Sequence, residues 1–262
     1  ELKALDAITH LTSLCREHSR AIDGLNFLTQ AERTMKDDAD RFRLRLELLR
    51  LLAADPAWSP DRGRAQIAAL FRVRHRGREA LAQLADWMSH EAEGGHRAAW
   101  MAILRAEARA GTDRPLAALA LSAFAKDAPA AFVNDLAQGW QNVADSDRIC
   151  LELAAELLLQ KQRPALAWQA CLVMQDLPSM RLESRKQPLM LRVAHAMNNR
   201  AIVQELFAEV VRMPVPGGSQ TVAWAQTLQE CGELNLAREL YQTALDRLEA
   251  TQGSQPDLTA AW

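Results

Sequence analysis

The densest group of ionisable side chains lies in the basic run Arg72-Val-Arg-His-Arg-Gly-Arg78. A guanidinium group forms paired hydrogen bonds to carboxylates and phosphates, so this run would suit phosphate, an anionic polysaccharide or an acidic protein surface. The run also covers the end of an expected helix, where the helix dipole favours cations, and this structural interpretation stands beside the functional one. Nucleic acid is not expected as a partner, because no aromatic residues are interleaved with these arginines and the net charge of the chain is −2.

A second polar segment, His90-Glu-Ala-Glu-Gly-Gly-His96, brings two imidazoles and two carboxylates close together in the sequence. A metal site usually takes at least three protein ligands that converge on one point, and here two glycines break the helix between the histidines. We interpret the segment as a polar helix end. We expect the chain to bind no metal and no other cofactor.

The residue patterns of common catalytic sites are absent from the sequence. It contains no glycine-rich phosphate loop, no G-x-S-x-G and no H-E-x-x-H, and Gly217-Gly218-Ser219 is typical of a turn. We therefore expect a protein that binds other molecules, not an enzyme. The alternative, an enzyme built on an α/α toroid, would need a pair of acidic residues in inward-facing loops, and the sequence indicates no such pair.

The elements that would position these side chains are predicted to be helices. Leu and Ala dominate the apolar residues, and alternating runs of Val, Ile and Thr are absent. No stretch approaches the ~18 consecutive apolar residues of a membrane helix, so no direct membrane insertion is expected. A small residue followed by larger apolar residues four and seven positions later recurs along the chain, and these offsets fall on one helix face. The triplets begin at Ala21, Ala80, Ala117, Leu166, Ala201 and Ala237.

Each triplet predicts the second helix of a pair, and a first helix is expected before it. The intervals between triplets leave room for two extra helices, near residues 38–54 and 130–142. Pro188 would interrupt a helix that spans it, so the helix at this point either starts near Gln187 or bends. The predicted first helices cover residues 1–14, 61–74, 97–110, 148–160, 182–197 and 219–231.

These pairs resemble the tetratricopeptide repeat, a helix–turn–helix of about 34 residues. The resemblance implies an all-α fold, an α-solenoid of stacked antiparallel helix pairs, and we expect one such domain over residues 1–262, as a fragment of a longer protein. The irregular intervals also fit looser helical stacks of the Sel1-like or HEAT-like kind. The residues that match the family pattern are Trp100, Gly111, Ala117, Phe124 and Pro129 in one repeat, and Gly232, Ala237, Tyr241 and Ala244 in the last.

The resemblance also implies a concave face lined by the first helix of each pair, where such proteins bind a peptide or domain of another protein. We predict an acidic or carboxylate-bearing partner segment near Arg72, Arg105 and Arg109. Carrying the register over gives the partner-binding residues Arg62, Arg72, Met101, Arg105, Arg109, Glu183, Lys186, Gln226, Gln229 and Glu230.

The bias of 26 Arg against 5 Lys and the degenerate repeats resemble, in style, the periplasmic helical-repeat regions of bacterial exopolysaccharide export proteins of the cellulose, Pel and poly-N-acetylglucosamine types. That resemblance implies a periplasmic scaffold that recruits a modifying enzyme or the polysaccharide. The alternative is a cytoplasmic regulatory adaptor that binds a peptide. The four cysteines show no C-x-x-C spacing; we interpret them as small buried apolar residues, with a Cys150–Cys171 disulfide as the alternative.

Overall fold

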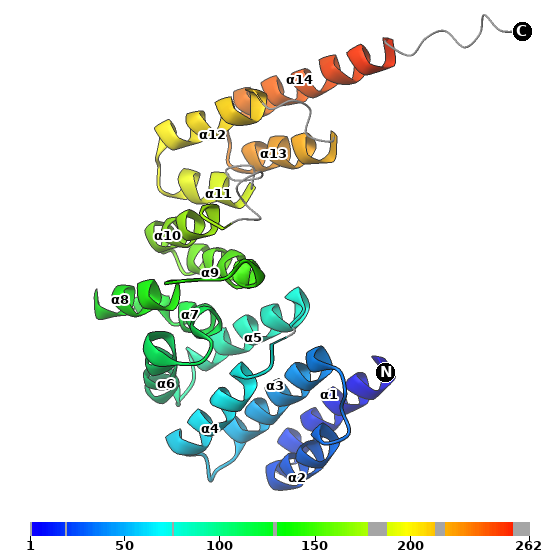
Figure 1. Ribbon diagram of the computed structural model, residues 1–262, viewed down its shortest axis with the longest axis vertical. Coiled ribbons are helices and arrows are strands. Elements are labelled where there is room, and N and C mark those ends of the chain that lie inside the picture. Colours follow the sequence, from blue (N-terminus) through cyan, green and yellow to red (C-terminus); the bar gives the residue numbers. More distant parts are fainter. Residues whose placement is uncertain are drawn as a thin grey trace, which may run out of the picture. The chain divides into compact units, whose positions relative to one another are not determined.

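The computed structural model describes residues 2–18, 20–74, 76–127, 130–177, 188–212 and 218–253. Within these ranges all regular structure is helical, and consecutive helices pack against each other (Figure 1), so the predicted all-α, solenoid-like fold class is confirmed. The α-helices are α1 Leu2–Glu17, α2 Ala21–Glu32, α3 Asp38–Ala54, α4 Pro60–Phe71, α5 Arg78–Glu91, α6 Arg97–Ala110, α7 Arg114–Ser122, α8 Ala130–Gly139, α9 Arg148–Gln160, α10 Pro164–Gln175, α11 Pro188–Ala196, α12 Arg200–Arg212, α13 Gly218–Glu230 and α14 Leu234–Gly253. Two short 3-10 helices, η1 Ala125–Asp127 and η2 Asp145–Asp147, lie beside α8.

The helix starts follow from capping residues in the sequence. The Ser59 hydroxyl accepts a hydrogen bond from the Arg62 N–H at the start of α4, and the Asp113 carboxylate does the same for Leu116 in α7. Prolines stand in the first turn of both helices, where a missing N–H does no harm. Pro188 is the first described residue of α11, and the residues before it, where the two sequence alternatives differ, lie outside the described ones.

Three helix–turn–helix connections share one geometry. After α9, α11 and α13, a residue with left-handed backbone, Gln162, Asn198 or Gly232, ends the helix. In each turn the next residue donates its N–H to a carbonyl five positions back, as Asn199 does to Ala194 and Glu233 to Leu228. The left-handed positions are 36 and 34 residues apart, which shows a structural repeat in this part of the chain.

The chain divides into two compact units, Glu1–Arg163 and Pro164–Trp262. The boundary lies between α9 and α10, two helices that the sequence pattern predicted as one pair. The prediction of a single solenoid domain stays a prediction, and each unit is described by itself.

The first unit is built of two rows of helices. Helices α1, α3, α5, α7 and α9 pack successively and form the odd row, whereas α4, α6 and α8 form the even row. Contacts of α3 with α4, and of α7 with α6 and α8, join the rows, and α2 packs on α1 and α3. The predicted pairing of 61–74 with the helix from Ala80 needs correction, because α4 packs mainly on α3 and α6 while α5 packs on α3, α7 and α9.

The two extra helices explain that difference. Each inserts one helix into the alternation between rows, so the predicted first helices α4 and α6 lie in the even row while α1 and α9 lie in the odd row. Helix α3 occupies a central place, in contact with α1, α2, α4 and α5. Its leucines are buried on several sides of the helix, which suits a helix covered by neighbours instead of facing water.

A glycine lets α4 and α6 approach closely. A Cβ atom at Gly63 would lie 3.2 Å from the ring of Trp100, which is fully buried in α6. Trp58 and Trp87 pack edge-on against the same ring, with ring centroids 5.6 Å from it. This aromatic cluster fixes α6 against α4 and α5.

In the second unit, α11 packs on α10, α12 and α13, and α14 packs on α12 and α13. The predicted pairs α11–α12 and α13–α14 are therefore packed hairpins, stacked through α11 on α13 and α12 on α14. In the described part of the chain, no helix combines the length and the apolar character needed to cross a membrane.

We predict that Leu51→Ala lowers the free energy of unfolding by about 2–5 kcal/mol, because Leu51 is fully buried with Leu28, Leu44 and Leu48 where α2 packs on α3. Urea denaturation followed by circular dichroism measures this. The control Ile22→Ala removes a side chain that is 62% exposed and should change stability by less than about 0.5 kcal/mol. Equal losses for the two variants would contradict the packing described.

Candidate functional site: an arginine-lined pocket

A polar pocket of about 590 Å³ opens in the first unit, where α4 ends and α7 begins. Its walls come from the segment after α4, the α6–α7 turn and the segment between α8 and α9. The charged side chains that line it are Arg72, Arg74, Arg76, Arg114, Asp113 and Asp147. We call it the arginine pocket.

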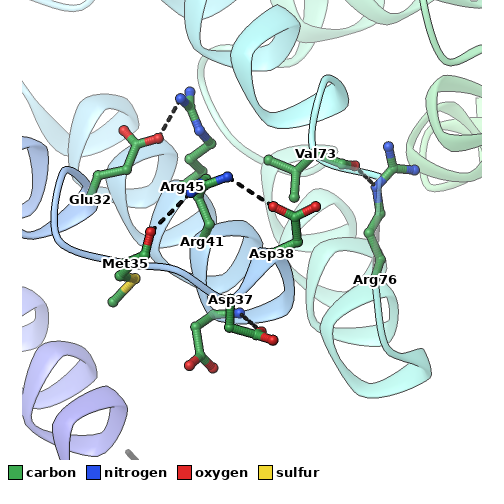
Figure 2. Close-up of polar contacts among 9 residues, drawn as sticks. Glu32, Met35, Asp37, Asp38, Arg41, Arg45, Val73 and Arg76 are labelled. Carbon is green, nitrogen blue, oxygen red and sulfur yellow. Dashed lines mark hydrogen bonds and ion pairs between the residues drawn. The ribbon is translucent and has the colours of Figure 1, made fainter.

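An ion pair holds two of these walls together. The Arg76 guanidinium, buried to 6% exposure, binds the Asp113 carboxylate at the start of α7. Arg76 also donates to the backbone carbonyls of Val73 and Phe71 (the Val73 bond is drawn in Figure 2). Its guanidinium carbon lies 5.7 Å from the Phe42 ring centroid, a cation–π distance. Arg76 therefore fixes the segment after α4 against α3 and α7.

Neighbouring arginines of α3 are likewise tied to partners. Figure 2 shows Arg41 bonded to Asp38 and to the Met35 carbonyl, both at 2.9 Å, and Arg45 paired with Glu32 of α2. These contacts anchor the start of α3 and the segment before it. Helix α3, whose Phe42 ring contacts Arg76, is therefore held by these pairs.

The basic run after α4 thus divides into two kinds of arginine. Arg78, at the start of α5, pairs with Glu152 and, at 3.5 Å, with Glu156 of α9. Arg76 and Arg78 therefore join elements of the fold, whereas Arg72 and Arg74 line the pocket and form no ion pair with a described residue. Arg76 and Arg78 thus have a structural role, through ion pairs and not through a helix dipole, and binding of an anion by Arg72 and Arg74 stays a prediction. His75 lies outside the described residues.

The pocket carries an excess of positive charge. Across the part of the chain that the structure describes, Arg72, Arg74 and Arg114 form no ion pair. Four arginines against two aspartates leave a formal charge of +2 on the lining. Such an arrangement favours an anion, and guanidinium groups would bind carboxylate or phosphate oxygens through paired hydrogen bonds.

Asp147 is held unfavourably in this pocket. Its burial, and then the Asp113 carboxylate, raise the pKa of Asp147 above its usual value, against the lowering effects of the Ala144 N–H bond and of Arg76. Beneath the same region, burial and Asp113 raise the pKa of the Cys150 thiol to about 12, so this thiol is protonated and a poor nucleophile at neutral pH. Cys150 and Cys171 are buried, as the interpretation of the cysteines as small apolar residues expects, whereas Cys15 and Cys231 are only partly buried.

The structure brings some of the predicted partner-binding residues into one row and gives several of them partners within the chain. Arg62 pairs with the buried Asp55 at 3.1 Å. Arg105 and Arg109 both bind Asp135 of α8, a carboxylate only 1% exposed. Met101 lies between them and the start of α6, half-buried.

Of the remaining predicted residues, Arg72 lines the arginine pocket. Gln226, Gln229 and Glu230 are exposed on α13 in the second unit, and Glu183 and Lys186 lie outside the described residues. Their partner-binding role stays a prediction. Helix register missed Arg74, Arg114 and Asp147, because they stand in or beside turns. The charge of the basic run could have indicated Arg74, and no comparable signal indicates Arg114 or Asp147.

The histidine-rich segment serves packing in the structure. The His96 ring stacks on Trp58 with centroids 4.0 Å apart, and Glu91 accepts a hydrogen bond from the Trp100 indole at 2.9 Å. Among the described residues, no three His, Cys, Asp or Glu side chains are placed to hold a metal ion together.

We predict that Asp147→Asn stabilises the protein at pH 7. A carboxyl whose pKa is raised on folding carries no penalty below its unfolded pKa, and the penalty grows as pH rises through the folded pKa. Asparagine keeps an oxygen for the Ala144 N–H but cannot ionise. Urea midpoints measured between pH 7 and pH 4 should show a gain at pH 7 that shrinks with acidification; a loss at pH 7 would contradict this reading of Asp147.

We also predict an asymmetry at Asp135. The double variant Arg105→Ala/Arg109→Ala leaves a buried carboxylate without its cations and should cost about 3–5 kcal/mol. Asp135→Asn removes the buried charge itself and leaves two arginines that are 26% and 50% exposed and so reach water, and about 1 kcal/mol is expected. Urea denaturation compares the two; equal costs would mean that the ion pairs do not fix α8 on α6.

Comparison of the chain with protein-family models, with curated proteins and with solved structures found no match. The function of the protein is therefore inferred from its own residues. They form an all-helical, solenoid-like fold whose first unit presents a pocket of three unpaired arginines within the described ranges.

Proposed function

We propose that this protein is a protein–protein interaction scaffold whose first unit binds an acidic segment of a partner in the arginine pocket. The observation that carries the proposal is the set Arg72, Arg74 and Arg114, which line one cavity and form no ion pair with any described residue. Arg76, in the same pocket, and Arg78 and Arg105, outside it, are paired with carboxylates of the chain. The unpaired arginines grouped in this cavity could instead bind carboxylates of a partner.

The size of the pocket supports a peptide-sized group as its occupant. A volume of about 590 Å³ falls in the range of ligand pockets, and its lining is mostly polar and charged. Two or three acidic side chains of a partner would offset the formal charge of +2. Arg76 and Asp113 pre-organise the walls, so little ordering entropy is lost when a segment binds.

The helical architecture supports a scaffold over an enzyme. Stacked helix hairpins present long faces to partners, and the resemblance to tetratricopeptide repeats makes a peptide or domain the expected class of partner. Because the chain resembles exopolysaccharide export proteins, the proposal includes a role in polysaccharide export, with the polysaccharide or its modifying enzyme as the partner. The cytoplasmic adaptor is the alternative, and both would use carboxylate recognition by the same arginines.

The test is a titration of a fluorescein-labelled hexaglutamate peptide, followed by fluorescence anisotropy, with polygalacturonate as a competing polysaccharide probe. We expect Arg72→Glu/Arg74→Glu to weaken peptide binding by at least about tenfold, since loss of two charge-assisted contacts exceeds about 1.4 kcal/mol. Asp147→Asn should strengthen binding by about threefold to tenfold, because it removes a negative charge from the pocket.

The matched control is Arg16→Glu/Arg33→Glu. It makes the same change in net charge at two exposed arginines outside the pocket, and Arg33 is the C-cap of α2 as Arg72 is of α4. Equal weakening by both double variants would mean that the peptide senses only net charge, and the proposal would fail. Polygalacturonate that binds the pocket more tightly than the peptide would replace the protein partner by a polysaccharide.

A further inference from the structure

Two adjoining pockets lie along one face of α5 and share Lys161, the residue that ends α9. The first, of about 330 Å³, lies between α5 and α9, and its lining includes the polar residues Asp86, Ser89, Glu156 and Gln160. Its apolar walls are Ala82, Ala85, Leu153 and Leu157. Their spacings of three and four residues place them on one face of each helix. The second, of about 420 Å³, continues past the end of α5 and is lined by Arg97, Lys126 and Lys161. We call the two together the lysine cleft.

The two ends of the lysine cleft differ in charge. Toward the start of α5, Arg78 binds Glu152 and Glu156 of α9, and Arg148 also binds Glu152, so two arginines offset two carboxylates there. At the other end, Lys126 and Lys161 share a lining with one carboxylate, Glu93, and with Arg97. Neither Lys126 nor Lys161 forms an ion pair with another residue that the structure describes.

The cationic end is held in place by the backbone. Arg163 donates hydrogen bonds to the carbonyls of Ala125, at 2.9 Å, and of Lys126, at 3.2 Å. These bonds fix η1, which carries Lys126, next to the end of α9, which carries Lys161. The floor beside them is Phe124, 1% exposed. The two ammonium groups therefore project from anchored backbone.

We propose that the lysine cleft is a second docking site, separate from the arginine pocket, for a short partner segment in which small apolar side chains are followed by carboxylates. The order of the segment follows from the order of the walls, because the apolar residues lie between α5 and α9 and the two lysines lie beyond them. From Ala82 to Glu91, α5 rises about 14 Å, which about four extended residues would span. A small inorganic anion would use the lysines but leave the apolar walls uncovered.

The experiment uses the full chain and two labelled peptides of equal charge, followed by fluorescence anisotropy. The first peptide has alternating leucine and alanine followed by three aspartates; the second has serine and glycine in place of the apolar residues. We expect the first peptide to bind at least about tenfold more tightly, because burial of its apolar surface adds to the ion pairs. Equal affinities would overturn the proposal.

Variants locate the binding. Lys126→Glu/Lys161→Glu should weaken the first peptide by at least about tenfold, and Ala82→Arg, which places a long side chain across the apolar wall, should reduce its advantage over the second. The control Arg33→Glu/Lys36→Glu makes the same charge change at exposed sites elsewhere. Circular dichroism and unfolding midpoints of all variants identify any that fail to fold.

Chemical protection gives a readout that does not depend on variants. With the first peptide bound, Lys126 and Lys161 should react more slowly with an amine-acylating reagent, whereas the exposed Lys36 should react at the same rate. Unchanged reactivity of both cleft lysines, or loss of the peptide only in Arg72→Glu/Arg74→Glu, would overturn the cleft. If hexaglutamate does not bind the arginine pocket, the protection of Lys126 and Lys161 is unaffected. The two proposals can therefore be disproved independently.

Discussion

The Arg76–Asp113 ion pair is the contact on which the arginine pocket depends. It joins the segment after α4 to the start of α7, and the cation lies against Phe42 of the central helix α3. Because Arg76 is almost fully buried, removing Asp113 would leave a charge without compensation, a change that typically costs about 3–5 kcal/mol. The same carboxylate caps α7 through the Leu116 N–H. One aspartate therefore starts a helix, neutralises a buried arginine and places two pocket walls.

This arrangement separates structural arginines from available ones. An arginine-rich chain that packs helices in two rows must pair each guanidinium that is taken out of water. Arg76 and Arg105 are paired in this way, with carboxylates in or beside other helices. What stays unpaired in a cavity, Arg72, Arg74 and Arg114, is the minority that recognition of an anion can use. Lys126 and Lys161, beyond the other end of α5, are likewise unpaired with described residues and line a cavity.

Two of the three arginines predicted to bind an acidic partner are paired within the chain instead. Arg72, Arg105 and Arg109 were predicted together from helix register, which counts positions on one helix and is blind to neighbours. The extra helix α8 brings Asp135 against α6 and gives Arg105 and Arg109 a buried partner. Charge reversal at these two positions would therefore test stability before it tested binding, whereas Arg72 and Arg74 can be changed at exposed positions.

The sequence by itself determined the helices. Triplets of apolar residues, capping residues such as Asp113 and prolines such as Pro60 act within one helix or turn, so local physics places the helix starts and ends. Tertiary structure alone decided the pairing of α4 with α3 and α6 instead of α5, and the grouping of charges into the arginine pocket and the lysine cleft. Those depend on contacts between residues tens of positions apart, such as Arg76 with Asp113 and Arg78 with Glu152, and periodicity along one helix carries no information about its neighbour.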